Sequence, residues 1–201
     1  MADKNKEVDS GNESSVFIPD KANAVYYAIM GLPITDEHPD YAALRLSNYI
    51  LGGGFLNSRL ATRIRQKEGL SYSVGSSLSA PAQDPAGGFT VYAIAAPENV
   101  EKVQAAVREE LDRVLESGFT AEEVEAAKKG YLESLKVARA KDDALAVTLT
   151  KYMDLERDLL WLDEWDKKLQ GLTADDLHEA FKKHIDPEML TIVTAGTLPK
   201  E

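Results

Sequence analysis

The chain has 201 residues, 44% of them apolar, which is enough for one large domain with a substantial core. Its 34 acidic residues outnumber its 23 basic residues and give a net charge of −11, which argues against nucleic-acid binding and against docking on anionic membranes. No apolar run reaches the ~18 residues of a membrane span. The lack of cysteine excludes disulfides, thiolate metal sites and a cysteine nucleophile.

The N-terminal part of the chain begins with a polar stretch. Residues 1–15 are rich in charged and small side chains, so we expect a flexible leader, with order beginning near Val16. The apolar run 24–30 is typical of a buried strand. From Asp40 the apolar residues recur at steps of three and four, which predicts a helix that ends at Gly52.

The next segment combines a second helix with a hairpin. Asn57 or Ser58 can cap this helix, and Gly69 can end it in a left-handed conformation. Strands are predicted at 71–79 and 89–96, joined by a turn. The apolar positions of the helix are Leu56, Leu60 and Ile64.

Helices fill most of the chain after Pro97. A clean apolar stripe predicts the first of them, and capping boxes at Thr120 and Thr173 predict the starts of two others. Asp142 or Asp143 can cap a further helix that runs to about 158. A short helix at 161–169 and a final strand at 190–195 complete the order. Strands joined by hairpins, with helices collected between them, indicate an α+β fold: a mostly antiparallel sheet with helices packed on one face. The stripe consists of Val100, Val103, Val107, Leu111 and Val114.

The histidines give no metal motif along the chain. His178 and His184 are six residues apart, about 240° around a helix, so their rings cannot close on one ion. His38 lies in a distant loop, and no His-x-x-Glu-His sequence occurs. We therefore interpret the histidines as ordinary surface residues and expect no metal site in this chain.

Arg65 and Tyr72 are the strongest candidates for functional residues. With Leu60 at the centre of the buried face, Arg65 lies about 140° away and points away from the core. Strict alternation puts Tyr72 on the same face as Val74 and Leu78, which is the apolar face. Spacing alone therefore favours a core tyrosine and leaves its role open.

A family resemblance bears on this pair. The sequences Leu51-Gly-Gly-Gly, Ser58-Arg-Leu and Arg65-Gln-Lys-Glu-Gly-Leu-Ser-Tyr72-Ser-Val resemble the C-terminal, non-zinc domain of the pitrilysin, insulin-degrading enzyme and mitochondrial processing peptidase family. These proteins are zinc metallopeptidases of the inverzincin type. The resemblance covers about 16–198, and the spacing of seven between arginine and tyrosine is its most specific element. It implies one α+β domain over residues 16–201.

The resemblance also implies roles for the two residues. Family members consist of paired α+β domains that close like a clamshell around an unfolded peptide, and one domain of each pair carries the zinc. The other domain supplies an arginine and a tyrosine, which correspond here to Arg65 and Tyr72. Arg65 would bind substrate carbonyl oxygens. Tyr72 would be catalytic, donating a hydrogen bond to the oxyanion in trans to the zinc domain.

The missing zinc motif limits what this chain can do by itself. We expect it to be inactive alone and to hold no cofactor, with zinc in a catalytic domain of the same or a partner polypeptide. Its other partner would be a peptide substrate, and surface that normally faces the zinc domain can cause self-association. A catalytically dead structural or assembly domain is the alternative. An anion-binding module built on Gly52, Gly53 and Gly54 is a third hypothesis. For the parent protein we favour an exported or periplasmic location.

Overall fold

The structure is a computed structural model that describes residues 11–198. A five-stranded sheet with the order β1-β5-β2-β4-β3 forms its base. Three of the four strand pairings are antiparallel, and only β1 and β5 run parallel. The prediction of a mostly antiparallel sheet is confirmed. The strands are β1 (Glu13–Phe17), β2 (Ala24–Leu32), β3 (Ser71–Ser79), β4 (Gly87–Ala95) and β5 (Thr191–Gly196).

The edge strand β1 starts earlier than the sequence suggests. It begins at Glu13, three residues before the expected onset of order at Val16. Its side chains are exposed and show no alternation, so their pattern gave no strand signal. Backbone pairing with β5, for example Ser14 opposite Val193, holds the strand in place. Residues 13–15 are therefore not part of a flexible leader, and residues 1–10 of that segment lie outside the described residues.

The helices agree well with the predicted order. The stripe along α2 is buried at every predicted position, and the capping boxes at Thr120 and Thr173 are both formed. The long helices are α1 (Tyr41–Asn48), α2 (Val100–Ser117), α3 (Ala121–Arg139), α4 (Asp142–Asp154), α5 (Leu160–Gly171) and α6 (Ala174–His184). Short π or 3-10 turns are η1 (Tyr49–Gly53), η2 (Phe55–Asn57), η3 (Ala61–Lys67), η4 (Pro97–Asn99) and η5 (Pro187–Met189).

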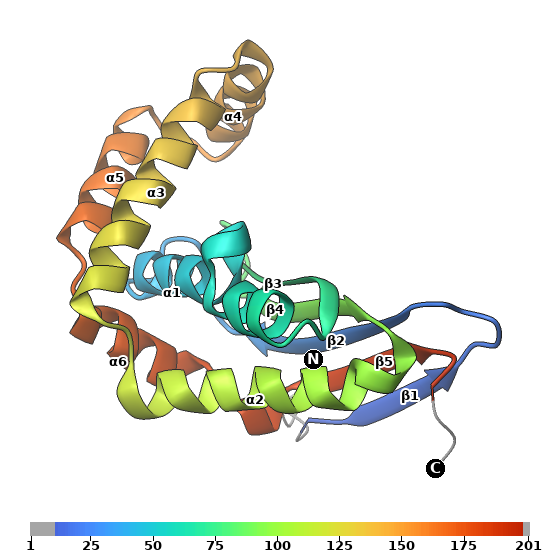
Figure 1. Ribbon diagram of the computed structural model, residues 1–201. Coiled ribbons are helices and arrows are strands. Elements are labelled where there is room, and N and C mark those ends of the chain that lie inside the picture. Colours follow the sequence, from blue (N-terminus) through green and yellow to red (C-terminus); the bar gives the residue numbers. More distant parts are fainter. Residues whose placement is uncertain (1–10, 199–201) are drawn as a thin grey trace, which may run out of the picture.

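The sheet has one covered face and one open face. Ala28, Phe89 and Val91 on the covered face are fully buried in the same core as the α2 stripe, and α2 and α6 lie on this side (Figure 1). On the other face Tyr27 and Ile94 remain 43% and 37% exposed. Helices thus pack on one face, as predicted.

Helices α3, α4 and α5 form an arm that projects away from the sheet (Figure 1). The base of the arm is fastened by Arg157, whose two terminal nitrogens donate to Asp36 at 2.8 and 2.6 Å. Both side chains are less than a tenth exposed, and the guanidinium also lies over the Trp161 ring. The chain leaves α4 at Asp154 to make this contact, so the prediction of a helix reaching 158 was too long.

The predicted cap of α4 was also wrong. The residue that precedes α4 is Lys141, whose side chain makes no capping bond. Asp142 and Asp143 lie instead within its first turn, where Oδ1 of Asp143 accepts from the Ala144 backbone N–H at 2.8 Å. Their carboxylates can also interact with the positive end of the helix dipole, which gives the same acidic sequence signal.

Candidate functional site

The candidate site is built around the short helix η3, which carries the basic residues. Ser58 lies shortly before η3: its hydroxyl accepts from the Ala61 backbone N–H at 3.4 Å and donates to the Phe55 carbonyl at 2.8 Å. Leu60 and Ile64 are fully buried, as predicted. Leu56 is 38% exposed, so its predicted core position was wrong. The reason is that residues 55–57 form a separate 3-10 turn and are not the first turn of this helix.

The helix ends as the sequence predicts. Gly69 has φ of +63°, a conformation that glycine adopts without the steric cost of a side chain. The chain then enters β3 directly. Arg65 and Tyr72 therefore stand on two elements that meet at one tight corner.

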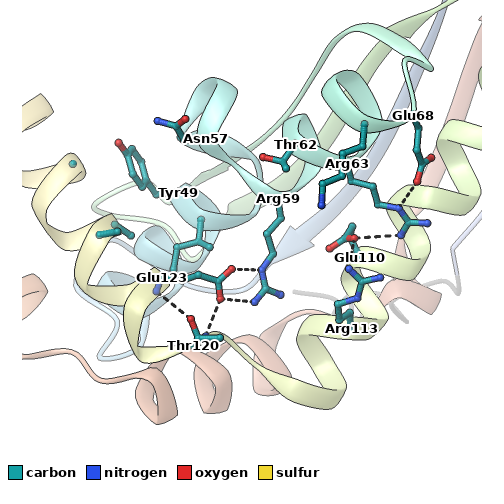
Figure 2. Close-up of a pocket in the computed structure, with 16 residues that line it drawn as sticks. Tyr49, Asn57, Arg59, Thr62, Arg63, Glu68, Glu110, Arg113, Thr120 and Glu123 are labelled. Carbon is teal, nitrogen blue, oxygen red and sulfur yellow. Dashed lines mark hydrogen bonds and ion pairs between the residues drawn. The ribbon is translucent and has the colours of Figure 1, made fainter.

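Two of the arginines in this segment are paired inside the molecule (Figure 2). Arg59 donates to both carboxylate oxygens of Glu123 at 2.8 and 2.7 Å. Arg63 bonds Glu68 at 2.9 Å, and it also contacts Glu109 and the buried Glu110. These residues line a cavity of about 860 Å³ between η3, α2 and α3, except for Glu109, which lies outside it. Because the charges cancel in pairs, we assign Arg59 and Arg63 to the fold.

The pairing also fixes the charge state of an acidic partner. Hydrogen bonds from the Arg59 guanidinium hold the pKa of Glu123 below its usual value. The Thr120 backbone N–H, part of the capping box of α3, adds to this effect. Glu123 therefore ties the start of α3 to the basic segment as a carboxylate.

Arg65 differs from its two neighbours. It is exposed, which agrees with the outward orientation that helix geometry predicts. Among residues 11–198 no carboxylate lies within 4 Å of its guanidinium. Its side chain lines a small hollow of about 130 Å³ together with Phe55, Ser73 and Tyr92. The charge is thus available to a ligand at the surface.

Tyr72 is 63% exposed, so the core position that strict alternation favours is wrong. The cause is a β-bulge at the start of β3. Ser71 stands opposite Ala95 and Ser73 opposite Ile94, so Tyr72 is an extra residue with no partner in the register. Such a bulge re-aims a side chain. Alternation recovers beyond it, and Val74 and Leu78 are buried.

The three glycines serve close packing. A Cβ on Gly52 would lie 2.4 Å from the backbone nitrogen of Ser76 in β3, and one on Gly53 would lie 2.8 Å from the Asn48 amide nitrogen. Only glycine lets η1 approach β3 this closely. These contacts account for the glycines without an anion.

The histidines fall into two groups. Nε2 of His178 lies 2.9 Å from the Leu115 carbonyl, whereas His184 meets Asp40 and His38 at the start of α1. The side chain of His184 is only 10% exposed, so its interpretation as an ordinary surface residue was wrong. Spacing arguments compared His178 with His184 and missed the loop that brings His38 to the end of α6.

Comparison with known proteins places these features in a family. Residues 2–131, more than half of the chain, match the family model described as "Peptidase M16 inactive domain". The chain belongs to the peptidase M16 inactive-domain family. Insulin-degrading enzyme and its relatives, which the sequence motifs resemble, are M16 peptidases, so the resemblance is confirmed. No helix among the described residues is both long and apolar enough to span a membrane.

Individual relatives agree with this membership. The chain is 35% identical over 154 residues to an uncharacterized zinc protease of Streptomyces coelicolor, covering 76% of this chain and 32% of that protein. It is 26% identical over 197 residues to the non-peptidase homolog YmxG of Helicobacter pylori, covering 97% and 44%. The crystal structure of a peptidase M16 inactive domain from Pseudomonas fluorescens superimposes with a TM-score of 0.82 at 28% identity, covering 95% and 45%. The chain thus spans less than half the length of these relatives.

Proposed function

We propose that residues 16–201 are the substrate-binding, oxyanion-supporting domain of a zinc-dependent endopeptidase. The zinc would be held by a catalytic M16 domain on the same or a partner polypeptide, and this chain alone would be inactive. The observation that carries the proposal is the bulge that turns Tyr72 out of the core, seven residues after Arg65, which is exposed and has no ion pair within residues 11–198. The family membership supports it, because the family is defined as an inactive domain of peptidases.

Tyr72 would act on the transition state of peptide hydrolysis. Its phenol O–H can donate one hydrogen bond. A zinc-bearing partner domain would supply the activated water, and a donor already in position on this chain would stabilise the charge developing on the scissile carbonyl oxygen more than the neutral carbonyl. Placement on a strand bulge would hold the phenol at the surface without the mobility of a long loop.

Arg65 would position the peptide. A guanidinium presents five N–H donors in a fixed plane and stays charged at any physiological pH. Because its charge has no carboxylate partner within the described residues, it can donate to substrate carbonyl oxygens without first breaking an ion pair. Arg63 makes ion pairs with three carboxylates of the fold, so it cannot take this role without breaking them.

The decisive experiment is peptide hydrolysis by the complete enzyme, with the zinc-bearing domain present and Tyr72→Phe introduced. Loss of one oxyanion donor typically lowers kcat by ~10²–10³, so a fall of that size with little change in KM is expected. Tyr27→Phe is the matched control, because Tyr27 is also an exposed strand tyrosine but lies on β2. A decrease in kcat smaller than tenfold for Tyr72→Phe would contradict the oxyanion role.

A structural or assembly domain is the second candidate function. It is favoured by the likeness of nearly the whole chain to YmxG, whose name describes a non-peptidase homolog. In this case no zinc-bearing partner would gain activity from the chain. Mixing the chain with a partner that carries His-x-x-Glu-His and measuring hydrolysis separates the two candidates: activation supports the peptidase, and complex formation without activation supports the scaffold.

A further inference from the structure

Three potential metal ligands meet where the loop after β2 reaches the end of α6. His38 lies in that loop, Asp40 precedes α1, and His184 is the last residue of α6. Their donor atoms all lie within 4.8 Å of one another: Nε2 of His184 is 2.8 Å and Nδ1 of His38 is 3.9 Å from Oδ2 of Asp40. These elements are not those that carry Arg65 and Tyr72.

The three side chains are already suited to ligation. Nδ1 of His38 accepts a hydrogen bond from the Asp40 backbone N–H at 3.2 Å, so a metal bound at this nitrogen would replace that hydrogen bond. Oδ2 of Asp40 accepts a hydrogen bond from the Lys183 ammonium at 2.7 Å and lies 2.8 Å from Nε2 of His184, an environment that suits a carboxylate. The two imidazole rings are 5.1 Å apart in an edge-on arrangement, with Asp40 beside both.

We propose that His38, Asp40 and His184 form a binding site for a late first-row divalent cation, with zinc as the best fit. Two imidazole nitrogens and one carboxylate oxygen suit zinc, nickel or copper, whereas calcium and magnesium prefer oxygen ligands. In a tetrahedral zinc site with bonds of about 2.0–2.1 Å, donors lie about 3.4 Å apart. The two separations from Asp40, 2.8 and 3.9 Å, bracket that value, and all three donor atoms lie within 4.8 Å of one another. Water would complete the coordination.

Lys183 is the group that competes with the metal. Its ammonium lies 2.7 Å from the same oxygen of Asp40 and repels a cation there. The side chain is 62% exposed, so it can swing into solvent when the metal binds. This competition distinguishes a metal site from a cluster held only by hydrogen bonds. In a metal site, removal of the lysine charge increases the affinity for the cation; in a cluster without a metal, it removes a stabilising hydrogen bond.

A cation bound at this site would link the loop after β2 to the end of α6. Asp36, four residues before Asp40 in the same loop, holds Arg157 at the base of the arm. A cation on His38 and His184 would therefore stabilise the junction of sheet, α6 and arm. The inference replaces our sequence-based expectation that the chain binds no zinc, and it assigns no catalytic role to the metal.

The test is calorimetric titration of the untagged 201-residue chain with zinc chloride, together with the visible absorption spectrum of the cobalt(II) form. One zinc per chain is expected. His38→Gln and His184→Gln should each weaken binding at least ~10- to 100-fold, since loss even of a group that only orients a ligand has that effect. Lys183→Met should tighten binding severalfold. His178→Gln, on the same helix but outside the cluster, should leave the affinity unchanged.

Two outcomes would overturn the inference. One is zinc affinity that both cluster variants retain; the other is wild-type binding too weak to saturate at millimolar zinc. Thermal melting with and without zinc provides a second measurement: the midpoint should rise for the wild type and stay fixed for His38→Gln, a loop variant expected to fold. Neither readout involves peptide hydrolysis, so failure here leaves the proposed function untouched.

Discussion

The segment that contains Arg59, Arg63 and Arg65 has two sides, and the arginines on these sides differ in their contacts. On one side Arg59 and Arg63 are bonded to carboxylates of α2, α3 and the segment itself. On the other side Arg65 stands exposed near the bulge that presents Tyr72. The same residue type, within seven positions, serves the fold in one case and stays available for a ligand in the other. The difference lies in the partners, which come from distant helices.

The largest effect on stability should follow from Arg63→Ala. Glu110 is only 2% exposed, and this substitution removes one of its two arginine partners. Breaking a buried ion pair typically costs about 3–5 kcal/mol. Because Arg113 remains and Arg63 is partly exposed, we expect a loss of about 2 kcal/mol in the free energy of unfolding, measured with urea. A loss below about 0.5 kcal/mol would mean that the ion pairs of Arg63 do not stabilise the fold.

A smaller, pH-dependent effect is expected at Glu123. Its folded pKa is lowered, mainly by Arg59, so its contribution to stability is present above the usual value of 4.5 and is lost as pH falls through the folded pKa. Glu123→Gln should therefore cost about 1 kcal/mol at pH 7, after allowance for solvent screening. The difference in free energy of unfolding between the variant and the wild type should disappear in acid. Urea unfolding at several pH values measures this difference, and a difference independent of pH would disprove the ion-pair assignment.

The smallest effect on stability should come from Arg65→Ala. The side chain is exposed and makes no ion pair within residues 11–198, so the free energy of unfolding should change by less than about 0.5 kcal/mol. In the complete enzyme the same variant should bind peptide substrate less well. Lys67→Ala, a neighbouring exposed cation, is the control. If Arg65→Ala and Arg63→Ala destabilise the protein equally, Arg65 contributes to the fold as much as Arg63 does, and the distinction between the two arginines is wrong.

Local patterns explain why much of the fold could be predicted. The apolar stripe of α2 and the box that begins with Thr120 are signals within one helix, and both were read correctly. The strand β1 was not predicted because its side chains are exposed and its position depends on pairing with β5 from the far end of the chain. Period and capping rules describe a single element and carry no information about its distant neighbour.

The candidate site was predictable in part for the same reason. The outward direction of Arg65 follows from helix geometry alone. The exposure of Tyr72 depends on a bulge, because one extra residue turns it away from the face that carries Val74 and Leu78. The meeting of His38 with His184 depends on tertiary packing between a loop and a terminal helix, which spacing along the sequence cannot express.

The loop between β2 and α1 joins parts of the molecule that otherwise share few contacts. Asp36 holds the arm through Arg157, and Asp40 holds the end of α6 through His184. Regions tied through one short segment tend to open together as a single cooperative unit. We therefore expect local unfolding of the arm and fraying of α6 to be coupled through this loop.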